Sequence, residues 1–345
     1  MLAKHAREVA RQWVVESGRH LSGFRGAFFH GSINWLPDDA VLAAGSDVDV
    51  MVVLAGGTPP VKLGKFVYRE VLLEVSYLSS EQLQSPETVL GLHHLAGSFR
   101  TPGIIADPTG ELARLQAAVG SDYAKRRWVR KRCESARDKV LHGFPLHESD
   151  PLHQQVNAWV FPAGITTHVL LVAALKNPTV RKRYVAVREL LEEYRHFAFY
   201  STFLELPGCA RMSREQVERH LHALTEVFDA AEARIKSPVP FASDISPAAR
   251  PIAIDGSREM IERGDHREAI FWMVVTYSRC RQVLYHDAPE DVQRRYDPGY
   301  RRLLADLGIT SFADLQQRRE QVTASLPRVW EVAEAIMAAN PEIKD

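Results

Sequence analysis

The spacing of hydrophobic residues changes once along the chain, and the change divides it into two parts. Near the start, Leu2, Ala6, Val9 and Trp13 recur at the three- and four-residue spacing of an amphipathic helix, which Gly18 would end. From there to residue 120, short runs rich in β-branched and aromatic residues alternate with turn sequences. The predicted strands cover residues 26–30, 47–54, 66–68, 71–77 and 104–106, and a helix that begins at Asp107-Pro108 follows the last of them.

After Gly120 the strand patterns disappear and helical spacing takes over. Val129, Cys133, Ala136 and Val140 mark the buried face of one helix. The further predicted helices cover residues 152–175 (broken or kinked near Pro162), 179–206, 213–235, 264–286 and 312–339. The sequence therefore predicts an α+β protein, in which a small mixed-sheet domain of residues 1–120 is followed by an all-helical domain of residues 121–345.

Asp47 and Asp49 stand two residues apart in a β-branched run that includes Val48 and Val50. In a strand, residues two apart point to the same face, so both carboxylates project side by side while the valines enter a core. Two carboxylates this close repel each other, and the pKa of one rises unless a cation lies between them. A divalent cation that prefers oxygen ligands, such as Mg²⁺, removes the repulsion. The alternative is a solvated pair on a surface strand.

An apolar segment that ends in Phe28 and Phe29 runs into Gly31-Ser32, upstream of the aspartates. Glycine allows a sharp turn and a close approach to a ligand, and a helix beginning there would direct backbone N–H groups at an anion. A phosphate-binding turn beside a metal-binding pair of carboxylates is typical of active sites for phosphoryl or nucleotidyl transfer.

The segment His30-Gly31-Ser32, followed after a gap by Asp47-Val48-Asp49-Val50, resembles the signature of the nucleotidyltransferase superfamily related to DNA polymerase β. The gap is longer than this family usually has, and residues 35–40 look like an additional loop. The order of the two domains is similar to that of kanamycin-type and other antibiotic nucleotidyltransferases.

The resemblance implies that residues 1–120 are a nucleotidyltransferase catalytic domain. It implies that Asp47 and Asp49 hold two Mg²⁺ ions during catalysis and that Gly31 and Ser32 hold the triphosphate. The implied reaction transfers a nucleoside monophosphate from a nucleoside triphosphate, with ATP expected, and releases pyrophosphate. The implied acceptor is a hydroxyl of a small molecule, for example an aminoglycoside-like antibiotic.

Glu74 is a single charge in the apolar run from Val71 to Val75. An isolated buried carboxylate is unfavourable without a partner, so we expect Glu74 to face out of the core. The superfamily has a third acidic residue on a later strand, and Leu73-Glu74-Val75 is similar to it. The resemblance implies that Glu74 is a third metal ligand or the base that deprotonates the acceptor hydroxyl. The alternative is a solvated glutamate on an edge strand.

The chain has 43 basic and 43 acidic residues, so it has no overall field that would attract long nucleic acids. Its cysteines, Cys133, Cys209 and Cys280, fit no zinc-binding spacing and indicate reduced thiols. The N-terminus lacks the apolar core of a signal peptide, and the longest apolar run, residues 169–175, is too short to cross a bilayer. We therefore expect a cytoplasmic protein with no membrane partner.

Two other functions stay open at this point. The same chemistry could act on a protein or RNA acceptor, as in the minimal nucleotidyltransferases of toxin–antitoxin pairs, although the large helical domain disfavours this. Alternatively, the chain could be a catalytically inactive nucleotide-binding protein, which the set of Asp47, Asp49 and Glu74 disfavours.

Overall fold

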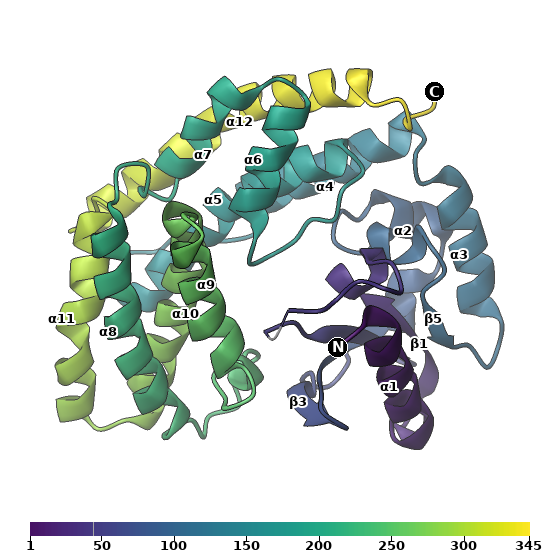
Figure 1. Cartoon of the computed structure of the whole chain (residues 1–345), viewed down its shortest axis with the longest axis horizontal. Helices are drawn as coiled ribbons and strands as arrows, with labels where there is room; N and C mark the ends of the chain where they lie inside the picture. Colours follow the sequence, from purple (N-terminus) through teal and green to yellow (C-terminus); the bar gives the residue numbers. More distant parts are fainter. Residues whose placement is uncertain (44) are drawn as a thin grey trace. The chain divides into compact units, whose positions relative to one another are not determined.

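The computed structural model describes residues 1–43 and 45–345, and these residues form two compact units (Figure 1). The first unit contains residues 1–132 and 341–345, and the second contains residues 133–340. The chain passes from one unit to the other inside helix α4 (Arg126–His142), twelve residues after the expected boundary at residue 120. The last residues return to the first unit, where the Lys344 N–H donates to a backbone carbonyl at 3.0 Å.

A five-stranded mixed sheet forms the centre of the first unit. Its strands are β1 (Phe24–His30), β2 (Val48–Leu54), β3 (Gly64–Tyr68), β4 (Val71–Ser79) and β5 (Ile104–Ala106). They lie in the order β3-β4-β2-β1-β5. β2 and β4 pair in parallel, whereas the other neighbouring strands pair antiparallel. The strands predicted from the sequence are therefore all present, in the mixed sheet of an α+β protein.

A two-residue turn joins β3 to β4 and fixes their register. Its central residues, Arg69 and Glu70, both have positive φ, 46° and 68°. Positive φ at both central positions is the signature of the type I′ turn, whose twist matches that of a tight hairpin. The resulting antiparallel register places Lys65 opposite Glu74.

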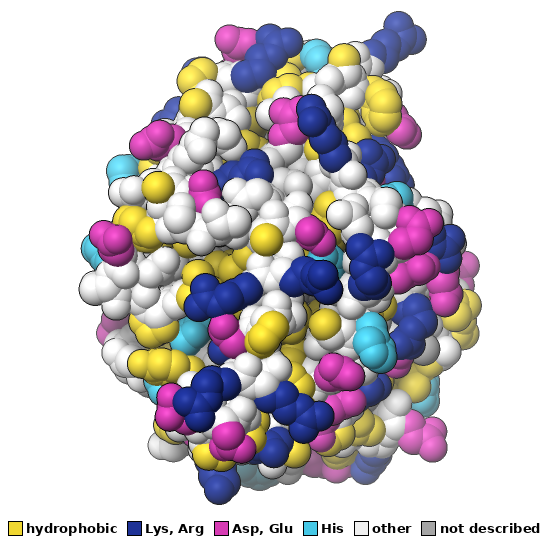
Figure 2. Space-filling view, turned by 90° about the vertical axis from the view of Figure 1, so that its left-hand side faces the viewer, with side chains coloured by type: hydrophobic (Ala, Val, Ile, Leu, Met, Phe, Trp, Pro, Cys, Tyr) yellow, Lys and Arg dark blue, Asp and Glu magenta, His cyan; other side chains and the backbone are white. Residues whose placement is uncertain are grey.

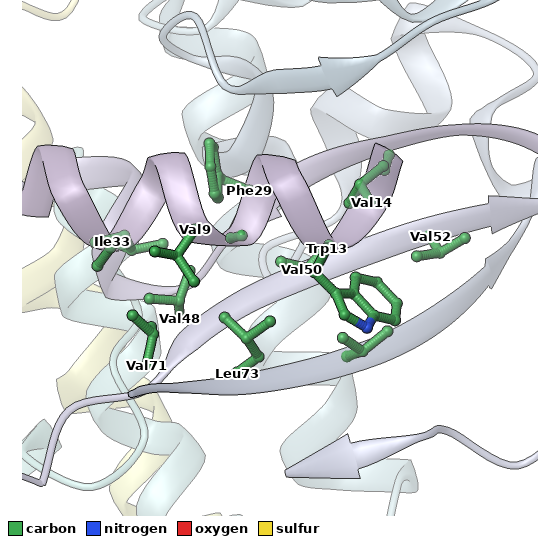
Figure 3. Packing of buried hydrophobic residues seen from close by; sticks show 14 of the residues in the cluster. Val9, Trp13, Val14, Phe29, Ile33, Val48, Val50, Val52, Val71 and Leu73 are labelled. Atoms are coloured by element: carbon green, nitrogen blue, oxygen red, sulfur yellow. The ribbon is translucent and has the colours of Figure 1, made fainter. Parts of the chain in front are cut away.

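Helix α1 (Ala3–Glu16) covers one face of this sheet (Figure 3). Its buried stripe, which includes Trp13, repeats at helical spacing and clusters with alternate residues of β2 and β4, such as Val50. Successive side chains of a strand point to opposite faces. Asp49 and Glu74 therefore point away from α1, to the other face of the sheet.

Two further α-helices and several short 3₁₀ turns complete the first unit. The helices are α2 (Pro86–Gly91) and α3 (Glu111–Asp122), and the 3₁₀ turns cover Gly18–His20, Ser32–Trp35, Ser80–Leu83 and Ala96–Phe99. α3 begins three residues later than the predicted start at Pro108, because Gly110 takes a left-handed φ of 71° before it. The Asp107 carboxylate still caps the helix, since it accepts from the Ala113 N–H at 2.8 Å.

Helices dominate the second unit, as the sequence predicted, and none of its described residues lies in a strand of the sheet. After α4, its helices are α5 (Leu152–Ala173), α6 (Arg183–Glu193), α7 (Tyr200–Glu205), α8 (Arg214–Glu232), α9 (Gly256–Glu262), α10 (His266–Asp287), α11 (Glu290–Asp306) and α12 (Phe312–Ala339). Shorter helical turns cover Phe197–Phe199, Ala242–Asp244 and, with π geometry, Pro251–Asp255.

Two helical predictions for this unit differ from the structure: an unbroken helix over residues 179–206, and a break at Pro162. The helix predicted over residues 179–206 is interrupted, because Arg195 has a φ of 62° between α6 and α7. A left-handed residue cannot continue a right-handed helix. Pro162, by contrast, lies inside α5 without ending it.

α5 is the one helix of the described residues that is long and apolar enough to span a membrane. Of its most apolar window, 89% is buried inside the structure. Apolar residues around the whole circumference are typical of a core helix as well as of a membrane span. The burial of α5 is that of a core helix.

Truncation of Trp13 tests the packing of α1 on the sheet. Trp13 is 5% exposed, and its ring centroid lies 5.6 Å from that of Phe66. We expect Trp13→Ala to lower the free energy of unfolding of the first unit by about 3–5 kcal/mol. Hydrogen exchange of the β1 and β2 amides measures this free energy in the full chain. Val15→Ala, at a 50% exposed position of the same helix, should change it by less than about 0.5 kcal/mol; equal effects of the two variants would contradict the packing.

Candidate functional site

Three carboxylates meet on the face of the sheet opposite α1. Asp47 directly precedes β2, Asp49 lies in β2, and Glu74 lies in β4. The parallel register pairs Asp49 with Glu74 directly. One carboxylate oxygen from each of the three residues lies within 4.8 Å of the others. The structure thus brings together the three acidic residues singled out in the sequence, with the difference that Asp47 stands just before the strand and not within it.

The acidic residues belong to a polar row that crosses four strands. Cross-strand pairing places Lys65 opposite Glu74, Glu74 opposite Asp49, and Asp49 opposite His30. Residues that pair directly across a sheet project from the same face. Glu74 is therefore not a solvated glutamate on an edge strand, because β4 lies between β3 and β2 and its side chain is 15% exposed.

Two lysines are ion-paired with the acidic residues. Lys65 Nζ lies 2.9 Å from Asp47 Oδ2 and also contacts a Glu74 carboxylate oxygen. Lys62 Nζ lies 2.5 Å from the other Glu74 oxygen. The Lys65 side chain is only 8% exposed and that of Lys62 is 25% exposed. The sequence pattern did not identify either lysine as part of the site.

The carboxylates of this cluster differ in their electrostatic environment. Burial raises the pKa of Asp49 well above its ordinary value, and the neighbouring charges of Asp47 and Glu74 raise it further. Burial would also raise the pKa of Glu74, but the ammonium groups of Lys65 and Lys62 outweigh it and lower that pKa to about 2. Glu74 is thus firmly ionised, whereas Asp49 retains its proton more readily than an ordinary aspartate.

Gly31 permits the close approach of β1 to the Asp49 carboxylate. Its φ is +61°, and a Cβ atom at this position would lie 2.0 Å from Asp49 Oδ2. Any other residue would be strained here and would displace the carboxylate. The helix expected after Gly31 is a single 3₁₀ turn, Ser32–Trp35, in which Ser32 is exposed. So short a turn adds little helix dipole, and any contact with a phosphate would come from individual N–H groups.

His30 extends the polar row on the β1 side. Its Nδ1 lies 2.6 Å from Ser98 Oγ. Burial and the nearby His94 lower the pKa of His30 to about 4, against a smaller opposing effect of Glu74. The imidazole is therefore neutral near pH 7, and it offers a hydrogen-bonding group instead of a positive charge.

The long connection between Gly31 and Asp47 is anchored to α1. Arg7 forms a 2.6 Å ion pair with Asp38, and its guanidinium also donates to the Ile33 carbonyl at 2.6 Å. The Ala3 N–H donates to the Ala40 carbonyl at 2.8 Å. The additional loop seen in the sequence is thus held in place by the helix that covers the core face.

A separate pocket of about 460 Å³ lies toward the other end of β2. It is lined by Arg25, Val53, Leu112 and neighbouring residues of α3 and of the 3₁₀ turn Ser80–Leu83, and none of the three carboxylates contributes to its wall. Val53 stands four residues beyond Asp49, about 13 Å along an extended strand. This pocket is therefore distinct from the acidic cluster.

The donor set of the acidic cluster fits a hard divalent cation. Carboxylate oxygens are the ligands that Mg²⁺ and Mn²⁺ prefer in proteins, and three of them from two paired strands and a short lead-in segment converge here. The chain matches no protein-family model and no curated protein. The chemistry of the site therefore follows from its own geometry.

Substitution of Gly31 tests the close approach to Asp49. We expect Gly31→Ala to destabilise the first unit by about 1–3 kcal/mol, since it adds both left-handed strain and a clash. Gly56→Ala is the matched control, because Gly56 has a φ of +102° but no atom within 4 Å of the place that a Cβ would take. Thermal unfolding of both variants separates strain from clash, and equal losses of stability would rule out the clash.

Neutralisation of Asp49 tests the raised pKa. A carboxyl whose folded pKa is raised holds a proton that the unfolded chain has already lost, so it lowers stability as the pH rises above about 4. Without divalent cations, the stability of Asp49→Asn relative to the native protein should therefore increase from pH 4 upward. Urea unfolding across this range measures the difference. Asp39→Asn, at an exposed position, should show no such trend; a difference for Asp49→Asn that does not vary with pH would contradict the electrostatics.

Proposed function

We propose that the chain is a Mg²⁺-dependent nucleotidyltransferase that moves a nucleoside monophosphate from a nucleoside triphosphate to a hydroxyl of a small molecule. The observation that carries this proposal is the convergence of Asp47, Asp49 and Glu74 within 4.8 Å, next to a glycine turn that approaches Asp49. ATP is the expected donor and an aminoglycoside-like antibiotic is one candidate acceptor. The cytoplasm, where nucleoside triphosphates are made and thiols stay reduced, is the proposed location.

Asp47, Asp49 and Glu74 would hold the Mg²⁺ ions. When bound, such ions neutralise phosphate charge and lower the pKa of an attacking hydroxyl. The backbone at Gly31 and Ser32 would hold the triphosphate. In the reaction, the acceptor hydroxyl would pass its proton to solvent water, and its oxygen would form a bond to the α-phosphorus. The bond from that phosphorus to the oxygen of the β-phosphate would break, and pyrophosphate would depart.

The electrostatics of Glu74 favour one of its two expected roles. A general base works best when its pKa lies near the operating pH. The lysines hold the pKa of Glu74 at about 2, which makes it a poor proton acceptor but a fully charged metal ligand. Glu74 is therefore proposed as a ligand, and not as the base.

The charge distribution supports a small acceptor over a long nucleic acid. Basic and acidic residues are equal in number, and on the face seen in Figure 2 their side chains are interspersed. Proteins that bind long nucleic acids usually present a continuous basic surface to the phosphates.

One observation favours a second candidate, a catalytically inactive nucleotide-binding protein. Lys65 and Lys62 already compensate the charge of the acidic cluster, so that the sheet can hold these carboxylates together without a metal ion.

A direct assay of nucleotidyl transfer distinguishes the two candidates. The protein is incubated with Mg²⁺, each labelled nucleoside triphosphate, and a panel of aminoglycosides, lincosamides and proteins, and labelled product and pyrophosphate are measured.

Under nucleotidyl transfer, Asp47→Asn and Asp49→Asn should each reduce product formation more than about 100-fold, because each removes a ligand of the metal site. Both variants should keep the fold, because asparagine has the size of aspartate and Lys65 keeps its contact with Glu74. Asp39→Asn, in the loop before β2, should retain activity. Full activity of either site variant would refute the proposed role, and absence of product from the native protein with every acceptor would favour the inactive candidate.

A further inference from the structure

Lys65 occupies the position in which a bound cation would neutralise the acidic cluster. Its ammonium group contacts both Asp47, which directly precedes β2, and Glu74, which lies in β4. The side chain is 8% exposed, although β3 is an edge strand. Its place is fixed by the hairpin, because the two-residue turn sets Lys65 directly opposite Glu74. The hairpin register therefore places a buried lysine among the carboxylates, which distinguishes this ion pair from a chance surface contact.

The two lysines and a divalent cation would compete for the same oxygen atoms. Lys62 and Lys65 each contact one of the two oxygens of Glu74, and Lys65 also contacts Asp47 Oδ2. A metal ion bound by these residues would lie a few ångströms from both ammonium groups, at a distance where like charges repel strongly in a partly buried site. Lysine contacts and metal binding at these oxygens therefore oppose each other.

Exchange requires the ammonium groups of Lys62 and Lys65 to move away from the carboxylates. A lysine ammonium sits on a flexible four-carbon stem. Lys62 lies in the segment before β3, between Val61 and Leu63, whose exposed fractions are 63% and 49%. Lys65 lies on the edge strand, with β4 on one side only. The exchange is therefore a movement of two side chains, and it leaves the strands of the sheet and the core beneath α1 in place.

We propose that Lys65 and Lys62 are the resident counter-ions of the acidic cluster, which exchange with a divalent cation and then contact the phosphates of the nucleotide. This inference rests on the proposed nucleotidyl transfer. In the metal-free protein, the ammonium groups stabilise three neighbouring carboxylates. With metal bound, the same positive charges lie beside the anionic triphosphate. The lysines thus set the metal affinity of the site and couple it to the arrival of nucleotide.

The test measures Mn²⁺ binding to the full chain by titration calorimetry and by electron paramagnetic resonance, without nucleotide. Lys65→Met keeps the length of the stem and removes the charge, so it should raise Mn²⁺ affinity by about ten-fold or more. Lys62→Met should have a smaller effect in the same direction, because Lys62 is more exposed and, among the described residues, is ion-paired with Glu74 only. Lys65→Arg keeps the charge and can hold a carboxylate bidentately, so it should leave the affinity unchanged or lower it.

Lys125→Met is the matched control, since it removes an ammonium group from a 2.7 Å ion pair with Asp122 outside the cluster. It should not alter Mn²⁺ binding, and Asp49→Asn should weaken binding in every background. The same variants are then titrated with a nucleoside triphosphate in saturating Mg²⁺, where Lys65→Met should lower nucleotide affinity several-fold. Circular dichroism confirms the fold, and Lys62→Met carries the test if Lys65→Met does not fold.

Mn²⁺ affinity that is unchanged or lower in both lysine-to-methionine variants overturns the exchange. Nucleotide affinity that is unchanged in Lys65→Met overturns the phosphate contact. Failure of the lysine exchange can be distinguished from failure of the proposed nucleotidyl transfer. If no acceptor is modified but Lys65→Met binds Mn²⁺ more tightly, the counter-ion role stands and nucleotidyl transfer falls. If transfer occurs but the variants bind Mn²⁺ as the native protein does, the exchange alone falls.

Discussion

Parallel pairing of β2 with β4 places Asp49 and Glu74 side by side on one face of the sheet, with Asp47 at the start of β2. Carboxylates in such a position repel one another, and burial makes each charge more unfavourable. The sheet tolerates this arrangement because the opposite face is tightly packed against α1, which fixes the register. A slip of one residue would exchange the acidic face with the core face.

The surrounding groups respond to this concentration of negative charge in different ways. Lys65 and Lys62 supply positive charge to Glu74 and hold its pKa low, while the pKa of Asp49 rises with burial. His30 stays neutral, and Gly31 leaves space for the Asp49 carboxylate. Together they form a site whose charge is balanced without an ion and whose oxygens are suited to one.

All of these groups belong to the first unit. The connection that leads into β2 is held by Arg7 of α1, so the helix that stabilises the core also positions the approach to Asp47. A binding site on strands that are anchored by a packed face is more rigid than a site on loops, and rigidity favours precise placement of charged ligands. In the proposed role, the lysines adjust the metal affinity of the site while the strands and α1 stay in place.

The sequence alone determined much of this arrangement. The spacing of Asp47 and Asp49, the valines between them and the isolated Glu74 predicted the acidic face, because alternation in a strand is a local property. Local signals also located the five strands and most helices, but missed the break at Arg195, where a left-handed conformation carries no strong sequence signal.

Tertiary structure decided which strands became neighbours, and therefore which charges met. The pairing of β2 with β4 joins segments separated by two turns and a strand, and no local pattern specifies it. The partnership of Lys65 with Glu74 follows from the register of the two-residue turn at Arg69-Glu70, and neither lysine was singled out in the sequence. Its contact with Asp47, and so the neutralisation of the whole cluster, exists only because the sheet brings β3, β4 and the start of β2 together.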